Sequence, residues 1–154
     1  ALVENICIGC TQVFNRSLLH VVRGHLPGTG ILHDWWMYLS AAYFGTVVFD
    51  PNAYVLYRQH SGNQVGMQPS WIRKQAARLG RAGQLKGLLS AQAADFSRVY
   101  GAAFGGNNRR VLWMMAGYRQ DWRKKRAILK GNAVYRQSRL DQLLYQMLFG
   151  IGYL

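Results

Sequence analysis

The hydrophobic pattern of the chain changes near residue 66, and this change limits the folds open to it. Residues 1–66 hold short β-rich runs separated by turn residues. They predict strands at 10–15, 46–50 and 53–57, and helices at 16–22 and 34–44. Residues 67–154 instead show apolar residues at helical spacing. We therefore predict an α/β part, with a few strands plus helices, followed by an all-helical tail.

The tail carries three amphipathic stripes, which predict three packed helices. A glycine pair, Gly105-Gly106, separates the first stripe from the second, and Ser138-x-x-Asp141 has the spacing of a capping box before the third. The stripes are Leu85, Leu88, Leu89, Ala93, Phe96, Val99 and Tyr100, then Val111, Met114, Met115 and Tyr118, then Leu140, Leu143, Leu144, Met147, Leu148 and Ile151.

The net charge of +13 belongs entirely to this tail. Residues 1–66 carry three Arg and three acids, whereas residues 67–154 carry 16 Lys and Arg and three Asp. Because half of the 154 residues are hydrophobic, an ordered core is expected rather than disorder. The longest apolar runs are too short for a membrane-spanning helix. The charge therefore indicates a partner with negative charge.

Basic clusters lie close to tryptophan in the tail, a pattern typical of proteins that bind a membrane surface. Phosphate groups of a nucleic acid would suit the same clusters, but no nucleic-acid-binding motif accompanies them, so the membrane is favoured. A solvated surface is the plain alternative. The residues expected to contact the membrane are Arg109, Arg110, Arg123, Lys124, Lys125 and Arg126.

The first candidate site is His33-Asp34-Trp35-Trp36, at the predicted start of a helix. A carboxylate there is held in one direction by the backbone, and the two indoles offer flat apolar surfaces on which sugar rings stack. The alternative is structural, because Asp is common at helix starts and a Trp pair often belongs to the core.

The second candidate is Arg58-Gln59-His60, at the end of a β-rich run. These side chains suit the oxygens of a diphosphate, or a metal in the case of His60. A solvated surface strand would carry the same residues. Cys7 and Cys10 also form a C-x-x-C spacing, but the run around them is apolar and a second pair is missing from the sequence, which favours a structural role over a metal or redox site.

Four motifs occur together in the order and spacing of a known family. They are Gly9-Cys10-Thr11-Gln12-Val13-Phe14-Asn15-Arg16, His33-Asp34-Trp35-Trp36, Asp50-Pro51, and Tyr54-x-x-Tyr57-Arg58-Gln59-His60-x-x-Asn63. In this combination the chain resembles the C-terminal, acceptor-side part of a bacterial family 2 inverting glycosyltransferase. The nearest resemblance is to rhamnosyltransferase-like members that build cell-surface polysaccharide, which often carry a basic helical tail.

The resemblance implies a GT-A type fold and transfer of a sugar from a nucleotide-activated donor, dTDP-rhamnose or similar, to a glycan or lipid-linked acceptor. It implies a divalent metal, Mg²⁺ or Mn²⁺, in the full-length enzyme. Residues 1–66 then form the acceptor-side catalytic part and residues 67–154 a basic helical extension. Asp34 corresponds to the base that takes the proton from the acceptor hydroxyl.

The other motif residues receive binding roles from the same resemblance. The first two motifs would line the acceptor side, while the last would close over the donor diphosphate, with His60 near the metal. The substrate-binding residues on this interpretation are Cys10, Thr11, His33, Trp35, Trp36, Arg58 and Gln59.

One feature of the family is missing from this sequence. Members carry an N-terminal nucleotide-binding half with an Asp-x-Asp metal motif, and this chain shows neither. We therefore expect a piece of a longer enzyme that is inactive by itself, binds metal and nucleotide weakly, and can self-associate through uncovered strand edges. The basic tail would hold the enzyme on the cytoplasmic face of the cell membrane. The rival hypothesis is a non-enzymatic basic module that binds anionic membrane or nucleic acid.

Overall fold

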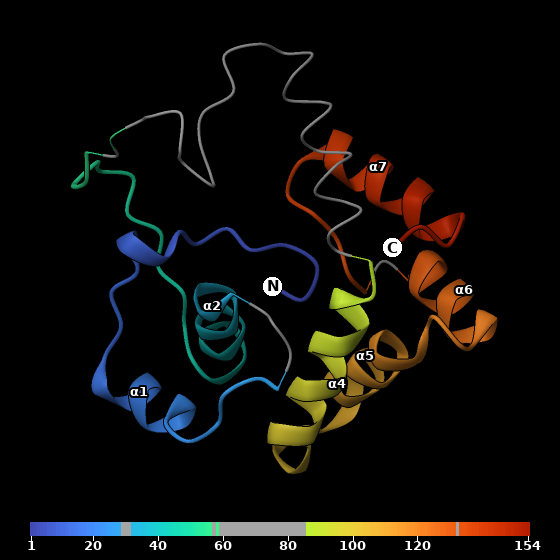
Figure 1. Cartoon of the computed structure of the whole chain (residues 1–154), viewed down its shortest axis with the longest axis horizontal. Helices are drawn as coiled ribbons and strands as arrows, with labels where there is room; N and C mark the ends of the chain where they lie inside the picture. The colour runs from blue at the N-terminus through green and yellow to red at the C-terminus, as the bar shows by residue number, and fades with distance from the viewer. Residues whose placement is uncertain (29–31, 57, 59–85, 132) are drawn as a thin grey trace.

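The chain forms a set of helices that pack around one core (Figure 1). The structure is a computed structural model and describes residues 1–28, 32–56, 58, 86–131 and 133–154. Figure 1 shows α1 and α2 on one side and α4 to α7 grouped on the other. The helices are α1 (Arg16–Val22), α2 (His33–Phe44), α4 (Leu88–Tyr100), α5 (Gly106–Gly117), α6 (Trp122–Gly131) and α7 (Arg139–Gly150), with 3-10 turns at Gly9–Thr11 and Gly101–Ala103.

The predicted α/β fold is wrong: the described residues form helices and no strand, so they do not make the expected GT-A type arrangement. The predicted strand at 10–15 overlaps the 3-10 turn, and its last residue, Asn15, is the N-cap of α1. Residues 46–50 and 53–56 have no regular structure, and Val48 and Phe49 are each 84% exposed. A β-rich run becomes a strand when a second strand pairs with it and a core covers one face. Neither condition is met within the described ranges.

The helices themselves begin where the sequence indicates. Asp34 lies in the first turn of α2, as predicted. The Asn15 side chain accepts a hydrogen bond from the Leu18 amide at 3.0 Å and so caps α1. Ser138 accepts from the Asp141 amide at 3.4 Å at the start of α7, which confirms the predicted cap.

The centre of the core is formed by α4 and α5, with α2, α6 and α7 packed around them. The first two predicted stripes are confirmed from Leu88 onward, because their central residues are buried in the core; Leu85 lies outside the described residues. From α2 the core takes Trp35, Trp36 and Leu39; from α4 and α5 it takes Leu89, Ala93, Phe96, Tyr100, Val111, Leu112, Met114 and Met115.

An aromatic cluster joins the first region of the chain to the helical tail. The Trp36 ring meets the edge of Phe96 at a centroid distance of 5.2 Å, and Phe44 packs on Tyr100 at 5.0 Å. Tyr43 lies 4.1 Å from Phe104, just after α4. Aromatic pairs at such distances contribute beyond their buried area, so α2 is held firmly against α4.

The third predicted stripe is divided by the fold. Helix α7 packs inward through Leu148 of the stripe and through Tyr145 and Phe149, which the stripe does not include; the Phe149 ring lies 4.4 Å from that of Tyr118. Leu144 is half-buried, and the other four members of the stripe, Leu140, Leu143, Met147 and Ile151, are 57–71% exposed. The helix is thus apolar on its outer face as well as its inner face. None of the helices that the structure describes is long and apolar enough to cross a membrane.

Candidate functional site

Two of the four motifs meet at the start of α2. The Gln12 side-chain amide donates to the main-chain oxygen of Asp34 at 2.9 Å, across 22 positions of sequence. Gly9 lies so close to the helix that a Cβ placed on it would be 3.3 Å from His33 Nε2 and 3.4 Å from Asp34 Cβ. The turn at Gly9–Thr11 is therefore packed directly against the predicted catalytic residue.

The Asp34 carboxylate is partly exposed and held in one orientation. Its Oδ1 accepts a hydrogen bond from the Trp35 amide at 2.7 Å, within the first turn of α2. Its Oδ2 lies on the side of Gly9, 3.8 Å from the position of a Cβ on that residue. One carboxylate oxygen thus accepts a hydrogen bond from the backbone, and the other faces Gly9, which has no side chain. Such a group can accept a proton from a hydroxyl placed beside it.

Cys7 adjoins this carboxylate. Burial raises the pKa of the Cys7 thiol, a hydrogen bond with the Gln12 side chain lowers it, and the negative charge of Asp34 raises it further. The net direction is upward, so the thiol is uncharged near neutral pH and lacks the thiolate character of a nucleophilic or metal-binding cysteine. Both Cys7 and the exposed Cys10 are free cysteines.

The two tryptophans of the motif do not form the expected stacking surface. Trp35 is 6% exposed and Trp36 is 1% exposed. The Trp35 indole donates to the Ala1 carbonyl oxygen at 2.8 Å, and the Trp36 indole donates to the His25 carbonyl oxygen at 2.9 Å. Both rings lie on the face of α2 that packs on the core. The sequence-based assignment of these two residues to substrate binding is therefore corrected, because a buried ring cannot stack on a sugar.

The remaining acceptor-side residues lie at the surface. Cys10, Thr11 and His33 are all exposed, and the Thr11 hydroxyl donates to the Ile8 carbonyl oxygen at 2.8 Å. Arg58 is exposed as well, while Gln59 and His60 lie outside the described residues. The structure therefore places the acceptor-side motifs together and leaves the donor-side motif undescribed beyond Arg58.

Asp50, from the third motif, forms a local turn rather than part of this site. Its Oδ1 accepts from the Asn52 amide at 2.9 Å, and its Oδ2 accepts from the Tyr54 hydroxyl at 3.0 Å. These hydrogen bonds lower the pKa of Asp50, the Asn52 amide having the largest effect. The carboxylate is thus ionised and serves to fold the segment back on itself.

The residues of the site do not by themselves suit a metal ion. Within the described ranges there is no group of three or more His, Cys, Asp and Glu that could hold one. Asp34 has a neutral thiol and an amide as its neighbours, rather than further carboxylates. The predicted divalent metal and the role of His60 therefore stay predictions, and we derive no step through a metal.

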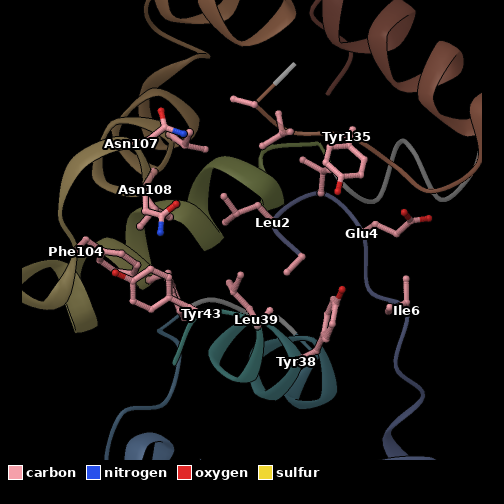
Figure 2. A pocket seen from close by; sticks show the side chains of 18 of the residues that line it. Leu2, Glu4, Ile6, Tyr38, Leu39, Tyr43, Phe104, Asn107, Asn108 and Tyr135 are labelled. Carbon is pink, nitrogen blue, oxygen red and sulfur yellow. The ribbon is translucent and has the colours of Figure 1, made fainter. Parts of the chain in front are cut away.

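A cavity of about 360 Å³ opens beside α2, one to two turns beyond Asp34. Figure 2 shows Tyr38, Leu39 and Tyr43 of α2 on one side of it, with Asn107 and Asn108 of α5 across from them. Burial raises the pKa of Tyr38, and the neighbouring Cys7 and Glu4 raise it further. Tyr38 thus lines the cavity and lies near Cys7, which in turn lies near Asp34. Local sequence patterns do not indicate this cavity, because its wall comes from residues far apart in the chain.

The basic residues predicted to contact a membrane gather on α5 and α6. Arg109 and Arg110 lie next to the exposed Trp113 along a shallow depression. Lys124 reaches across from α6, and its Nζ lies 3.7 Å from the centre of the Trp113 ring. Arg123 lies 5.9 Å from the ring of Trp122, which is 64% exposed. Arg126 is exposed, and Lys125 is half-buried.

Sequence reasoning missed the residues that build the site around Asp34. Cys7 was assigned to an apolar run, and Gln12 was part of a motif without a role of its own. Gln12 holds the main chain of Asp34, and Cys7 lies beside both. The signal that could have found them is Gly9, because a glycine directly before a polar stretch often marks a close approach of two backbone segments.

Comparisons with protein-family models, with curated proteins and with solved structures found no match for this chain.

Proposed function

We propose that this chain is the acceptor-side part of an inverting glycosyltransferase, with Asp34 as the general base. The observation that carries the proposal is the contact between the Gly9–Thr11 turn and the His33-Asp34 motif, which are distant in sequence. Both motifs belong to the resemblance with family 2 glycosyltransferases. The contact supports the proposal because an acceptor site needs a fixed base beside an open surface.

The reaction assigns each part of the site a task. The acceptor hydroxyl attacks the anomeric carbon of the donor sugar, and the bond from that carbon to the nucleoside diphosphate breaks on the opposite face. Asp34 takes the proton of the attacking hydroxyl through Oδ2, while Oδ1 stays bound to the Trp35 amide. The leaving diphosphate departs with the electron pair of the broken bond. This displacement inverts the anomeric centre.

Gln12 acts as a positioning residue in this proposal. Its side-chain amide donates a hydrogen bond to the main-chain oxygen of Asp34, and this bond fixes the position of Asp34 relative to the Gly9–Thr11 turn. Gly9 lets the turn lie directly against the start of α2, because even a methyl group there would approach His33 and Asp34 to within 3.3–3.4 Å. The exposed His33 and Thr11 side chains lie beside this contact and would bind hydroxyl groups of the acceptor.

The test is the transfer rate of the full-length enzyme that contains this chain. Asp34→Asn should lower kcat about 10²–10⁴-fold, the usual range for a lost general base. Asp141→Asn is the matched control, because Asp141 is likewise a first-turn acid of its helix and should leave kcat unchanged. Product is measured by mass with dTDP-rhamnose and with UDP-sugars as donors. An Asp34→Asn enzyme as active as the control would overturn the proposal.

A rival function rests on the basic tail. If the chain is a non-enzymatic basic module, the full-length protein transfers no sugar from any of these donors, and Asp34→Asn changes nothing that can be measured. The isolated chain is expected to be inactive on the glycosyltransferase proposal, because it supplies no donor half. Measurable transfer by the isolated chain would refute that expectation while supporting the reaction itself.

A further inference from the structure

The outer face of α7 carries an apolar stripe with no cover in the part of the chain that the structure describes. Leu140, Leu143, Met147 and Ile151 are 57–71% exposed, although the helix has a complete inner face of Tyr145, Leu148 and Phe149. Their spacing of three, four and four residues places them along one side of the helix, over a length of about 16 Å. Tyr153, 43% exposed, follows at its end. A contiguous apolar surface of this kind usually marks an interaction site.

A basic helix adjoins this stripe. Helix α6 lies between α5 and α7, since Lys124 reaches Gly117 and the Trp113 ring on α5, whereas Lys125 Nζ lies 3.6 Å from the position of a Cβ on Gly152 after α7. The outer side of α6 consists of the exposed residues Trp122, Arg123, Arg126 and Lys130. The helix next to the stripe therefore exposes cations and an indole.

Charge over the wider region has the same sign. Residues 86–154 contain 12 Lys and Arg and three Asp, and two of the acids are used locally. Asp95 pairs with Arg98 at 3.1 Å, and Asp121 accepts from the Arg123 amide at 2.8 Å at the start of α6. Even with all three acids ionised, the region has a formal net charge of +9.

We propose that the outer face of α7 and the basic side of α6 form a docking surface for an anionic lipid bilayer. The stripe enters the boundary between headgroups and acyl chains, and the α6 cations meet the lipid phosphates. Exposed tryptophan at the rim fits the same depth, where one side of the ring is apolar and the other is wet. This inference does not depend on the proposed glycosyl transfer.

A second copy of the chain fits the surface less well than a bilayer. Two copies packed through α7 would bring two basic α6 helices toward each other, and like charges at an interface oppose association. A nucleic acid would use the cations and leave the apolar stripe in water. The bilayer is the partner that uses the apolar stripe and the cations at the same time.

The experiment measures binding of the chain to vesicles of phosphatidylcholine with 30% phosphatidylglycerol by co-sedimentation. Leu143→Ser/Met147→Ser removes half of the stripe without changing charge, and we expect it to weaken binding at least about tenfold. Val48→Ser/Leu56→Ser is the matched control, because it removes two exposed apolar side chains outside the surface. Circular dichroism checks that both variants stay folded, which their exposure predicts.

A third variant, Arg123→Gln/Arg126→Gln, tests the cationic half of the surface. It should also weaken binding, and binding to pure phosphatidylcholine should be much weaker than to the anionic vesicles. Equal binding by the Leu143→Ser/Met147→Ser variant and its control would overturn the proposal. A wild-type dimer by light scattering that the same variant dissociates, without vesicle binding, would assign the stripe to a second copy. Binding to duplex DNA that the variant retains, again without vesicle binding, would assign the cations to nucleic acid.

Discussion

The two regions of the molecule differ in where they keep their apolar side chains. In residues 86–154, helices α4 and α5 bury the apolar positions predicted from their spacing, with Met115 and Ala93 fully buried. In residues 1–56 the core receives α2, Val3 and Val22, whereas many other apolar residues face solvent. The exposed residues of that region include Ile8, Val13, Leu26, Leu32, Val48, Phe49 and Leu56.

This difference shows that α2 holds the first region in place. Its inner face packs on α4 through Trp36, and its first turn carries Asp34 on the other side. The candidate site is thus built at the edge of the core, where a rigid helix meets a turn that the core does not cover. The helical region supplies the support for α2 and carries 12 of the 19 Lys and Arg residues.

The largest predicted effect concerns the packing of α2 on α4, which connects the two regions. Trp36→Ala removes a ring that contacts Phe96 and Tyr100, together with the hydrogen bond to the His25 carbonyl oxygen, and should cost about 3–5 kcal/mol of unfolding free energy. Trp122→Ala removes an exposed ring and should change stability by less than about 0.5 kcal/mol. Urea denaturation of both variants compares them. Similar losses would show that α2 does not join the regions.

The next effect distinguishes the two faces of α7. Leu148→Ala opens a cavity in the core and should cost about 2–5 kcal/mol, because Leu148 is 7% exposed. Leu143→Ala on the outer face, 63% exposed, should cost well under about 1 kcal/mol. Thermal unfolding measures both. If Leu143→Ala is the more harmful of the two, the division of the stripe described above is wrong.

A smaller effect follows from two buried tyrosines in the helical region. Burial raises the pKa of Tyr118 and of Tyr145, and Arg119 and Arg136 offset this in part. Above about pH 10 the unfolded chain loses these protons first, so stability is complete below that pH and falls above it. The expected slope is up to about 1.4 kcal/mol per pH unit for each tyrosine.

Tyr118→Phe/Tyr145→Phe provides the control for this prediction. Both hydroxyls are buried and have no hydrogen-bond partner among the residues that the structure describes, so their removal should be close to neutral at pH 7. The variant should lose less stability than the wild type between pH 10 and 11, measured by urea denaturation. Identical pH profiles would mean that neither hydroxyl is buried in solution.

The smallest effect compares helix caps in the two regions. Asn15→Ala removes the cap of α1 and Ser138→Ala the cap of α7, and each should cost about 0.5–1 kcal/mol of helix stability. Helix α1 is short and has one buried residue, Val22, so its loss should appear as local opening. Amide hydrogen exchange should therefore rise in α1 alone for Asn15→Ala. A global change of equal size would contradict the local character of α1.

The sequence predicted α1, α2, α4, α5 and α7 because their signals are local, whereas none of the predicted apolar stripes covers α6. Apolar spacing gave α4 and α5, an acid gave the start of α2, and a Ser-x-x-Asp pattern gave the cap of α7. Predicted strands failed because a strand depends on a neighbour that local pattern does not contain. The same limit explains why the buried side of α7 was not predicted. The spacing of its apolar residues identifies an apolar side, but burial of that side depends on other parts of the fold.

The candidate site was predicted in part, for a related reason. Asp34 and its position in a helix start follow from sequence alone. The contact with Gly9 and Gln12 depends on how the chain folds back over 22 positions, and the burial of Trp35 and Trp36 depends on α2 packing on α4. The spacing of the motifs contains no information on either contact. The hydrogen bond from Gln12 to Asp34 and the burial of the two tryptophans are therefore seen only in the structure.

The central claim is that the Gly9–Thr11 turn and the start of α2 together form an acceptor site, and backbone amide NMR of this chain tests it most directly. Methyl α-rhamnoside is titrated into the labelled protein, with Gly9→Ala as the variant whose methyl group presses against His33 and Asp34 and disturbs the contact between the turn and α2. We predict shifts concentrated at residues 9–12 and 33–34 that the variant loses. Shifts confined to α4–α7, or none at all, would contradict the claim.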